Sequence, residues 1–188
     1  MKPSLLLPFA LASHLAAGAL CAQVPGGAGI IYGAHHAFTI EAPPGWVIDN
    51  QAGISLGLHA VFYRTGESWQ RGTAVMYVNT APPDSGHEAD PLRIFAQDSV
   101  RFVTETPTMR IVSRPSLQTH DHKVAYVWYF SGASNGRYEA VAYVAEKTTT
   151  PMIVLTSKTQ TAFQRALPAF RQLVGSYSFL SSDVTLPR

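Results

Sequence analysis

Two strand candidates in the last third of the chain carry apolar side chains on both faces. In Val124 to Phe130 (VAYVWYF) and in Tyr138 to Ala145 (YEAVAYVA), apolar residues occupy odd and even positions alike. Successive side chains of a strand project to opposite faces, so strands of this kind are normally covered on both sides. The sequence therefore predicts a mainly antiparallel sheet with helices or long loops packed against each face.

The first helix is predicted after a loop rich in proline and glycine. Asp90 can cap it and Pro91 suits its first turn, where no backbone donor is needed. The helix ends by Pro107. Its apolar positions recur at three- and four-residue spacing. They are Leu92, Phe95, Ala96, Ser99, Phe102 and Val103.

A second amphipathic helix is expected between Phe163 and Tyr177, preceded by a strand candidate at Met152 to Leu155. Pro168 lies in its middle and lacks the backbone N–H that a helix interior uses, which costs about 3 kcal/mol in an unbroken helix. We therefore expect a kink or a break near Pro168. Gly175 is the expected stop.

Shorter patterns describe the first two thirds of the fold. Leu58 to Tyr63 and Ala74 to Val78 are predicted to form an antiparallel hairpin, joined by the loop Arg64 to Gly72. Ala37 to Glu41 is predicted as an edge strand. Two further short strands, Met109 to Val112 and Ser116 to Thr119, are expected around Pro115.

The N-terminus has the pattern of an export signal. Lys2 precedes the apolar stretch Leu5 to Leu20, and cleavage after Ala22 is expected. The 188-residue length suits one domain. The predicted organisation is a signal peptide at 1–22, a linker or flexible lead-in at 23–36 with a possible short strand at Ile30 to Tyr32, a single α+β domain at 37–182, and a tail at 183–188.

Localisation and partners follow from that pattern and from charge. The apolar stretch, broken by proline and histidine, is shorter than the roughly 20 residues of a membrane span, so no span is expected. Cys21 is the only cysteine. It either leaves with the signal or, in the alternative, carries a lipid and attaches the protein to a membrane. The 14 Lys and Arg residues form no clustered tract, so no nucleic-acid partner is expected. The protein is expected to be exported, to the periplasm or the medium.

The order of elements resembles that of a known superfamily. Five segments carry the resemblance. They are the early strand that ends in APPGW (Ala42 to Trp46), GLHAVFY (Gly57 to Tyr63), YEAVAYVAE (Tyr138 to Glu146), IVLTSKT (Ile153 to Thr159) and ALPAFRQLVGSYSFL (Ala166 to Leu180). They look like a group of uncharacterised exported bacterial proteins whose fold is similar to the PsbP-like superfamily.

That superfamily includes an extrinsic photosystem subunit, a Ran-binding nuclear import factor and a bacterial envelope lipoprotein. The resemblance implies an α-β-α sandwich with a central, mainly antiparallel sheet. It also implies a binding or assembly module without known enzymatic activity. The matching residues belong to turns, the core and helix ends, so no functional residue is carried over.

Two segments match the G-x-S-x-G pattern of serine hydrolases, around Ser55 and Ser134. A nucleophile elbow requires a strand before the serine and a helix after it. Ser55 precedes a strand candidate, and Ser134 lies in a predicted hairpin turn. A serine hydrolase is therefore only a remote alternative, and no enzymatic activity is expected.

Histidines and one glutamate are the other candidates for chemistry. His120 and His122 flank Asp121 and, in an extended segment, project to one face where they can chelate a metal. The competing interpretation is a solvated turn. His59, in an apolar strand, is expected to be a neutral histidine bonded to the backbone. Glu139 interrupts an apolar run and is expected to pair with Arg or Lys across the sheet or to face solvent.

Aromatic residues near the Arg64 to Gly72 loop suggest an interaction surface. Trp69 lies in this loop and Tyr63 precedes it, and exposed aromatics beside a loop are typical of contact surfaces. The predicted function is an exported, non-enzymatic binding or assembly module of the cell envelope that uses Trp69 and Tyr63 to bind a protein or small ligand. A metal-binding protein using His120 and His122 is the alternative. No cofactor is expected.

Overall fold

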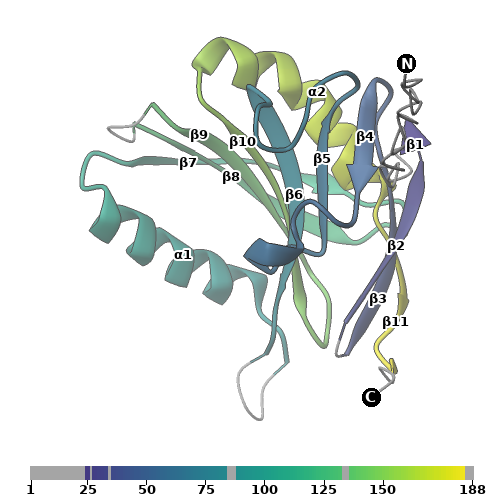
Figure 1. The fold of residues 1–188 in the computed structure, drawn as a ribbon. Coiled ribbons are helices and arrows are strands. Elements are labelled where there is room, and N and C mark those ends of the chain that lie inside the picture. Colours follow the sequence, from purple (N-terminus) through teal and green to yellow (C-terminus); the bar gives the residue numbers. More distant parts are fainter. Residues whose placement is uncertain (1–23, 26, 34, 84–87, 133–135, 185–188) are drawn as a thin grey trace, which may run out of the picture.

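A computed structural model describes residues 24–25, 27–33, 35–83, 88–132 and 136–184 and contains two sheets and two α-helices. The large sheet is antiparallel, with strand order β1-β4-β5-β6-β10-β9-β8-β7 (Figure 1). Its strands are β1 (Val24–Pro25), β4 (Trp46–Asp49), β5 (Ala60–Arg64), β6 (Ala74–Ala81), β7 (Arg110–Gln118), β8 (Val124–Ser131), β9 (Tyr138–Val144) and β10 (Thr150–Ser157).

The small sheet has three antiparallel strands, β2 (Ala28–Gly33), β3 (His36–Glu41) and β11 (Ser178–Ser181), with β3 in the centre. Phe38 pairs with Ile31 on one side and with Phe179 on the other. The predicted edge strand at Ala37 to Glu41 is therefore an inner strand. One neighbour, β2, contains the possible short strand at Ile30 to Tyr32, whereas the other, β11, follows the last helix and was not predicted.

Each face of the large sheet is covered by one helix, as the two-sided apolar strands predict. Helix α1 (Pro91–Glu105) lies on one face, and α2 (Gln160–Ser176) lies on the other beside the small sheet (Figure 1). The largest cluster of buried residues joins α2, the small sheet and one face of the large sheet. A second cluster lies under α1. The α-β-α layering expected from the sequence is confirmed.

Helix α1 begins as predicted but presents a partly different stripe to the sheet. The Asp90 carboxylate accepts a hydrogen bond from the backbone N–H of Leu92 at 2.9 Å, and Pro91 is the first helical residue. Ile94 is buried, whereas Leu92 and Val103 are exposed. Phe95 and Phe102 of the predicted stripe are half-buried and pack against aromatic rings of β8 and β9, so the stripe is reproduced in part.

Helix α2 runs without a break through Pro168. Thr159 caps its start by accepting from the backbone N–H of Ala162 at 3.2 Å. Buried residues on both sides of the proline hold the two halves against one core, which offsets the lost backbone hydrogen bond. They are Phe163, Ala166, Phe170, Leu173 and Val174. The helix ends at Ser176, one residue beyond the predicted stop at Gly175.

Three further strand predictions can be compared with the structure. The hairpin of β5 and β6 is confirmed, with Val61 paired to Tyr77. The two short strands expected around Pro115 are one strand, β7, whose register shifts between Arg114 and Leu117. The predicted lead-in at 23–36 contains β1 and β2, which pair with β4 and β3. This segment is therefore largely part of the sheets.

None of the helices in the described part of the chain is both long and apolar enough to cross a membrane.

Candidate functional site

The face of the large sheet that carries α1 contains two neighbouring depressions. The first, which we call the Trp69 cleft, has a volume of about 380 Å³. It is lined by Trp69, Gln70, Gly72, Thr73, Val75, Arg137, Thr156, Ser157 and Lys158. The second, the α1 cavity, has a volume of about 190 Å³. It is lined by Leu58, Tyr77, Asn79, Asp98, Arg101, Phe102, Glu139, Val141, Met152 and Val154.

The two depressions are consecutive parts of one trough. Strands β6 and β10, and β9 with the residue just before it, each give residues two positions apart to both depressions, and in extended chain such residues project from the same face. The pairs are Val75 and Tyr77, Thr156 and Val154, and Arg137 and Glu139. The trough therefore follows three adjacent central strands of the sheet.

The trough exists because two separate segments, α1 and the loop between β5 and β6, pack on this face of the sheet and leave a gap between them. Helix α1 packs over a cluster that includes Phe130 and Tyr143. The loop between β5 and β6 packs over a different cluster, formed by Val47, Val61, Tyr63 and Val75. Tyr77 contacts both clusters and lies between them. A concave, partly apolar surface bounded by two fixed walls is the usual form of a ligand site.

Trp69 forms one wall and is held in place by its loop. Its ring packs edge-on against the ring of Tyr77, with the centroids 6.1 Å apart. The backbone N–H of Gly72 donates to the carbonyl of Ser68 at 2.8 Å, and Gly66 takes the left-handed φ of 86° that suits glycine. Trp69 is thus a half-buried, positioned side chain, and its prediction as a contact residue is compatible with this location.

Tyr63 is buried, so it does not provide the exposed aromatic surface on which its prediction as a binding residue was based. Only 2% of the residue is exposed, and its hydroxyl donates to the Asp49 carboxylate at 2.8 Å. Tyr63 follows the alternation of β5 into the cluster beneath the loop. It therefore supports the wall that Trp69 presents. The position of Tyr63 next to the loop in the sequence indicated proximity but not the side on which the ring lies.

Glu139 pairs with Arg137, which lies two residues earlier, just before β9 begins. Its Oε1 lies 2.6 Å from Nη2 of Arg137, and Arg137 also donates from Nε to the hydroxyl of Thr156 at 3.3 Å. The Glu139 side chain is only 4% exposed. Burial raises the pKa of Glu139, and the charge of Arg137 opposes that rise without cancelling it. A buried carboxylate with a raised pKa in a cavity is a recognised mark of a functional site.

Replacing Glu139 with glutamine is expected to raise the free energy of unfolding at pH 7. A raised pKa in the folded state means that the protonated form is favoured, so stability from this group is present at low pH and is lost as the pH rises above the ordinary value of 4.5. Urea unfolding at pH 4 and pH 7 measures this: the difference between variant and parent should be larger at pH 7. A variant less stable than the parent at pH 7 would show that the ion pair with Arg137 is net stabilising.

The α1 cavity contains a second carboxylate that sequence spacing did not indicate. Asp98 on α1 accepts from the Tyr143 hydroxyl at 2.9 Å and from Nη2 of Arg101 at 2.9 Å. It lines the same cavity as Glu139. The two residues belong to a helix and a strand that meet only in the folded chain, so no motif joins them. Each carboxylate is paired with an arginine, Glu139 with Arg137 and Asp98 with Arg101.

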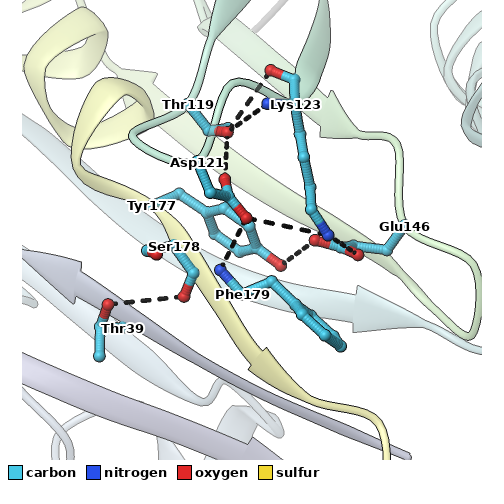
Figure 2. Close-up of polar contacts among 8 residues, drawn as sticks. All are labelled: Thr39, Thr119, Asp121, Lys123, Glu146, Tyr177, Ser178 and Phe179. Carbon is cyan, nitrogen blue, oxygen red and sulfur yellow. Dashed lines mark hydrogen bonds and ion pairs between the residues drawn. The ribbon is translucent and has the colours of Figure 1, made fainter.

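His120 and His122 lie on an exposed turn between β7 and β8. Asp121 between them accepts from the Thr119 hydroxyl at 2.5 Å and from the backbone N–H of Phe179 at 3.1 Å, which fixes the turn (Figure 2). Within the described residues, no three His, Cys, Asp or Glu side chains gather as a metal site would require. The two histidines therefore lie on one turn, but among the described residues they are not part of a group of three metal-ligating side chains.

The remaining candidates are dispersed. His59 is half-buried and its Nε2 lies 3.1 Å from the hydroxyl of Thr80, so its partner is a side chain rather than the predicted backbone group. Burial lowers the pKa of His59. Ser55 is exposed in a short 3₁₀ helix, η1 (Ile54–Leu56), and is followed by strand β5, not by a helix. Ser134 and Cys21 lie outside the described residues.

A buried polar cluster, which no sequence pattern indicated, joins three distant segments (Figure 2). Glu146, which is 7% exposed, forms an ion pair through Oε2 with Lys123 and accepts through Oε1 from the Tyr177 hydroxyl at 2.9 Å. The ammonium of Lys123 also lies 4.1 Å from the centre of the Phe179 ring. Both carboxylate oxygens are engaged by the protein itself. We therefore assign this cluster to the stability of the fold.

The sequence matches no protein-family model, and no curated protein sequence is significantly similar to it. Among solved structures, the chain is similar to cyanobacterial PsbP (CyanoP) from Synechocystis sp. PCC 6803. The match has a TM-score of 0.52 and 13% sequence identity and covers 87% of this chain and 96% of that one. This similarity confirms the PsbP-like α+β fold expected from the sequence.

Proposed function

We propose that the protein is an exported, non-enzymatic binding or assembly module of the cell envelope and that it contacts its partner through the Trp69 cleft. The observation that carries the proposal is the preformed cleft itself, in which the Trp69 ring forms a wall beside the apolar side chain of Val75. The resemblance to PsbP-like proteins supports a binding role by analogy of fold.

Export is expected to leave a mature chain that begins at Gln23. The apolar stretch before Ala22 and the small residues around it support this cleavage site. The measurement is the intact mass of protein recovered from the periplasmic fraction and the medium of the source cells. A mass that includes residues 1–22, found only in the cytoplasm, would contradict the proposal. An acylated chain beginning at Cys21 would establish the lipid-anchored alternative.

Replacing Trp69 with alanine is expected to abolish capture of the partner from an envelope extract. The substitution removes the largest apolar surface of the cleft, and aromatic anchors of this kind commonly contribute 2 kcal/mol or more to binding, a loss of about thirtyfold in affinity. The measurement is a pull-down with immobilised protein followed by quantitative mass spectrometry.

The matched control is Trp128→Ala. Trp128 is also a partly buried tryptophan on this face, but it stacks on Phe95 of α1 at a centroid distance of 3.8 Å and does not line the trough. The Trp128 variant should keep the partner that the Trp69 variant loses. Equal capture by the parent and the Trp69 variant would show that the cleft is not the contact.

A further inference from the structure

A third depression adjoins the Trp69 cleft, and cationic side chains line both of them. It has a volume of about 440 Å³ and shares Thr73 with the cleft. It is lined by Arg64, Glu67, Thr73, Ala74, Thr159, Thr161, Ala162 and Arg165. Together the two depressions are bordered by four cationic residues, which we call the basic rim. They are Arg64, Arg137, Lys158 and Arg165, and the only carboxylate among the lining residues is Glu67.

The basic rim is assembled by the antiparallel sheet from four separate segments. Ser157, at the end of β10, pairs with Ala74 at the start of β6 and with Tyr138 at the start of β9. Arg137 and Lys158 directly flank these paired positions, so they come to one end of the sheet. Arg64 ends β5, and Arg165 lies in the second turn of α2. For this reason the four cationic residues form no basic tract in the sequence, although they lie around the same two depressions in the fold.

Part of this charge faces solvent. The Arg137 side chain is 48% exposed even while it pairs with Glu139, and Lys158, Arg64 and Arg165 are also exposed. The Arg64 guanidinium lies 5.4 Å from the centre of the Trp46 ring, which holds it at the rim by a cation–π contact. A cationic border around an apolar wall is complementary to a ligand that combines carboxylates with an apolar group.

We infer that the basic rim and the Trp69 cleft together bind an acidic peptide segment of a partner protein. An apolar or aromatic side chain of that segment packs on Trp69 and Val75, and flanking carboxylates pair with Arg137 and Lys158. This inference rests on the proposed binding function. A peptide fits better than one small carboxylate because the cations border two joined depressions, and a chain with several carboxylates engages them together. Arginine forks bind carboxylates through paired hydrogen bonds.

The test is fluorescence anisotropy with the purified protein and three labelled peptides. The first has a phenylalanine between pairs of aspartate and glutamate residues. The second replaces the acids with asparagine and glutamine, and the third replaces the phenylalanine with glycine. The acidic phenylalanine peptide should bind at least about tenfold more tightly than either control, because each control lacks one of the two contacts. Its affinity should fall when salt is raised, as screening weakens exposed charge pairs.

Substitutions at the rim separate charge from folding. Lys158→Gln should weaken binding of the acidic peptide about fivefold to tenfold, and Lys158 is the better position to test because Arg137 also pairs with the buried Glu139. Lys147→Gln, which removes an exposed charge from the turn at the other end of β9 and β10, should leave binding unchanged.

Other outcomes overturn the inference in distinguishable ways. Equal binding of the acidic and neutral peptides would leave the cleft as a contact but remove the role of charge. No binding of any peptide, by protein that still captures a Trp69-dependent partner, would overturn the acidic-peptide inference and keep the proposed function. Displacement of the acidic peptide by a single-stranded oligonucleotide at lower concentration would instead indicate a phosphate-backbone ligand.

Discussion

Replacing Glu146 with glutamine is expected to lower the free energy of unfolding by about 3 kcal/mol. The buried Glu146 carboxylate pairs with the ammonium of Lys123 and accepts from the hydroxyl of Tyr177 (Figure 2). Removing one charge from a buried ion pair costs about 3 to 5 kcal/mol, because the other charge is left without compensation. The Lys123 side chain is 28% exposed and its ammonium also lies 3.8 Å from the Asp121 carboxylate, so water and Asp121 recover part of that cost. Urea unfolding followed by circular dichroism measures the change.

Two variants serve as controls for Glu146. Tyr177→Phe removes one donor to the same carboxylate and should cost about 1 kcal/mol. Glu105→Gln changes an exposed carboxylate at the end of α1 and should alter stability by less than about 0.5 kcal/mol. If Glu146→Gln were as mild as Glu105→Gln, the cluster would not be the stabilising unit that its contacts indicate.

The Glu146 cluster also separates stability from binding. It joins Lys123, just before β8, and Glu146, just after β9, to Tyr177 at the end of α2. None of these residues lines the Trp69 cleft. A Glu146 variant studied at a temperature where it remains folded should therefore bind the acidic peptide with the affinity of the parent. Loss of binding in both the Glu146 and the Lys158 variants would indicate a general effect of folding.

The layered fold was predictable because its signal is local. Strands with two apolar faces require cover on both sides, and Asp90 followed by Pro91 is a helix start that the structure reproduces. The small sheet was only partly predictable: strands were expected within β2 and β3, but β11, which pairs with β3, lies at the far end of the chain after α2. Of the kink or break expected near Pro168, the break does not occur, because α2 is continuous through this residue. Its local cost is offset by core contacts of residues on both sides of it.

The candidate site was only partly predictable. Trp69 stood out as an aromatic residue in a polar loop, and the structure places it on the wall of a cleft. Tyr63 has the same chemistry but the opposite orientation, which strand register decides. The basic rim and the pair of carboxylates in the α1 cavity were invisible in the sequence, because their members meet only when strand ends and helices are brought together. The spacing of residues along the sequence reveals a motif only when its members lie in one segment, and the residues of this site come from several segments.

Replacing Phe38 with alanine is expected to lower the free energy of unfolding by about 4 kcal/mol, the largest effect of any substitution considered. Phe38 is fully buried in the centre of the small sheet, and its ring lies 4.8 Å from the ring of Tyr177 between centroids. Truncating a buried phenylalanine costs about 3 to 5 kcal/mol from lost burial and from the cavity that remains. The measurement is the urea midpoint and slope, read by circular dichroism and by tryptophan fluorescence.

Ile30→Ala is the matched control for Phe38, because Ile30 lies on the neighbouring strand but is 59% exposed. It should change stability by less than about 0.5 kcal/mol. A loss below about 1 kcal/mol for Phe38→Ala would mean that the small sheet contributes little to the common core. Phe38 belongs to the cluster on the α2 face, whereas the trough lies on the α1 face. Folded Phe38→Ala protein should therefore retain binding in the Trp69 cleft, since its defect lies on the other side of the sheet.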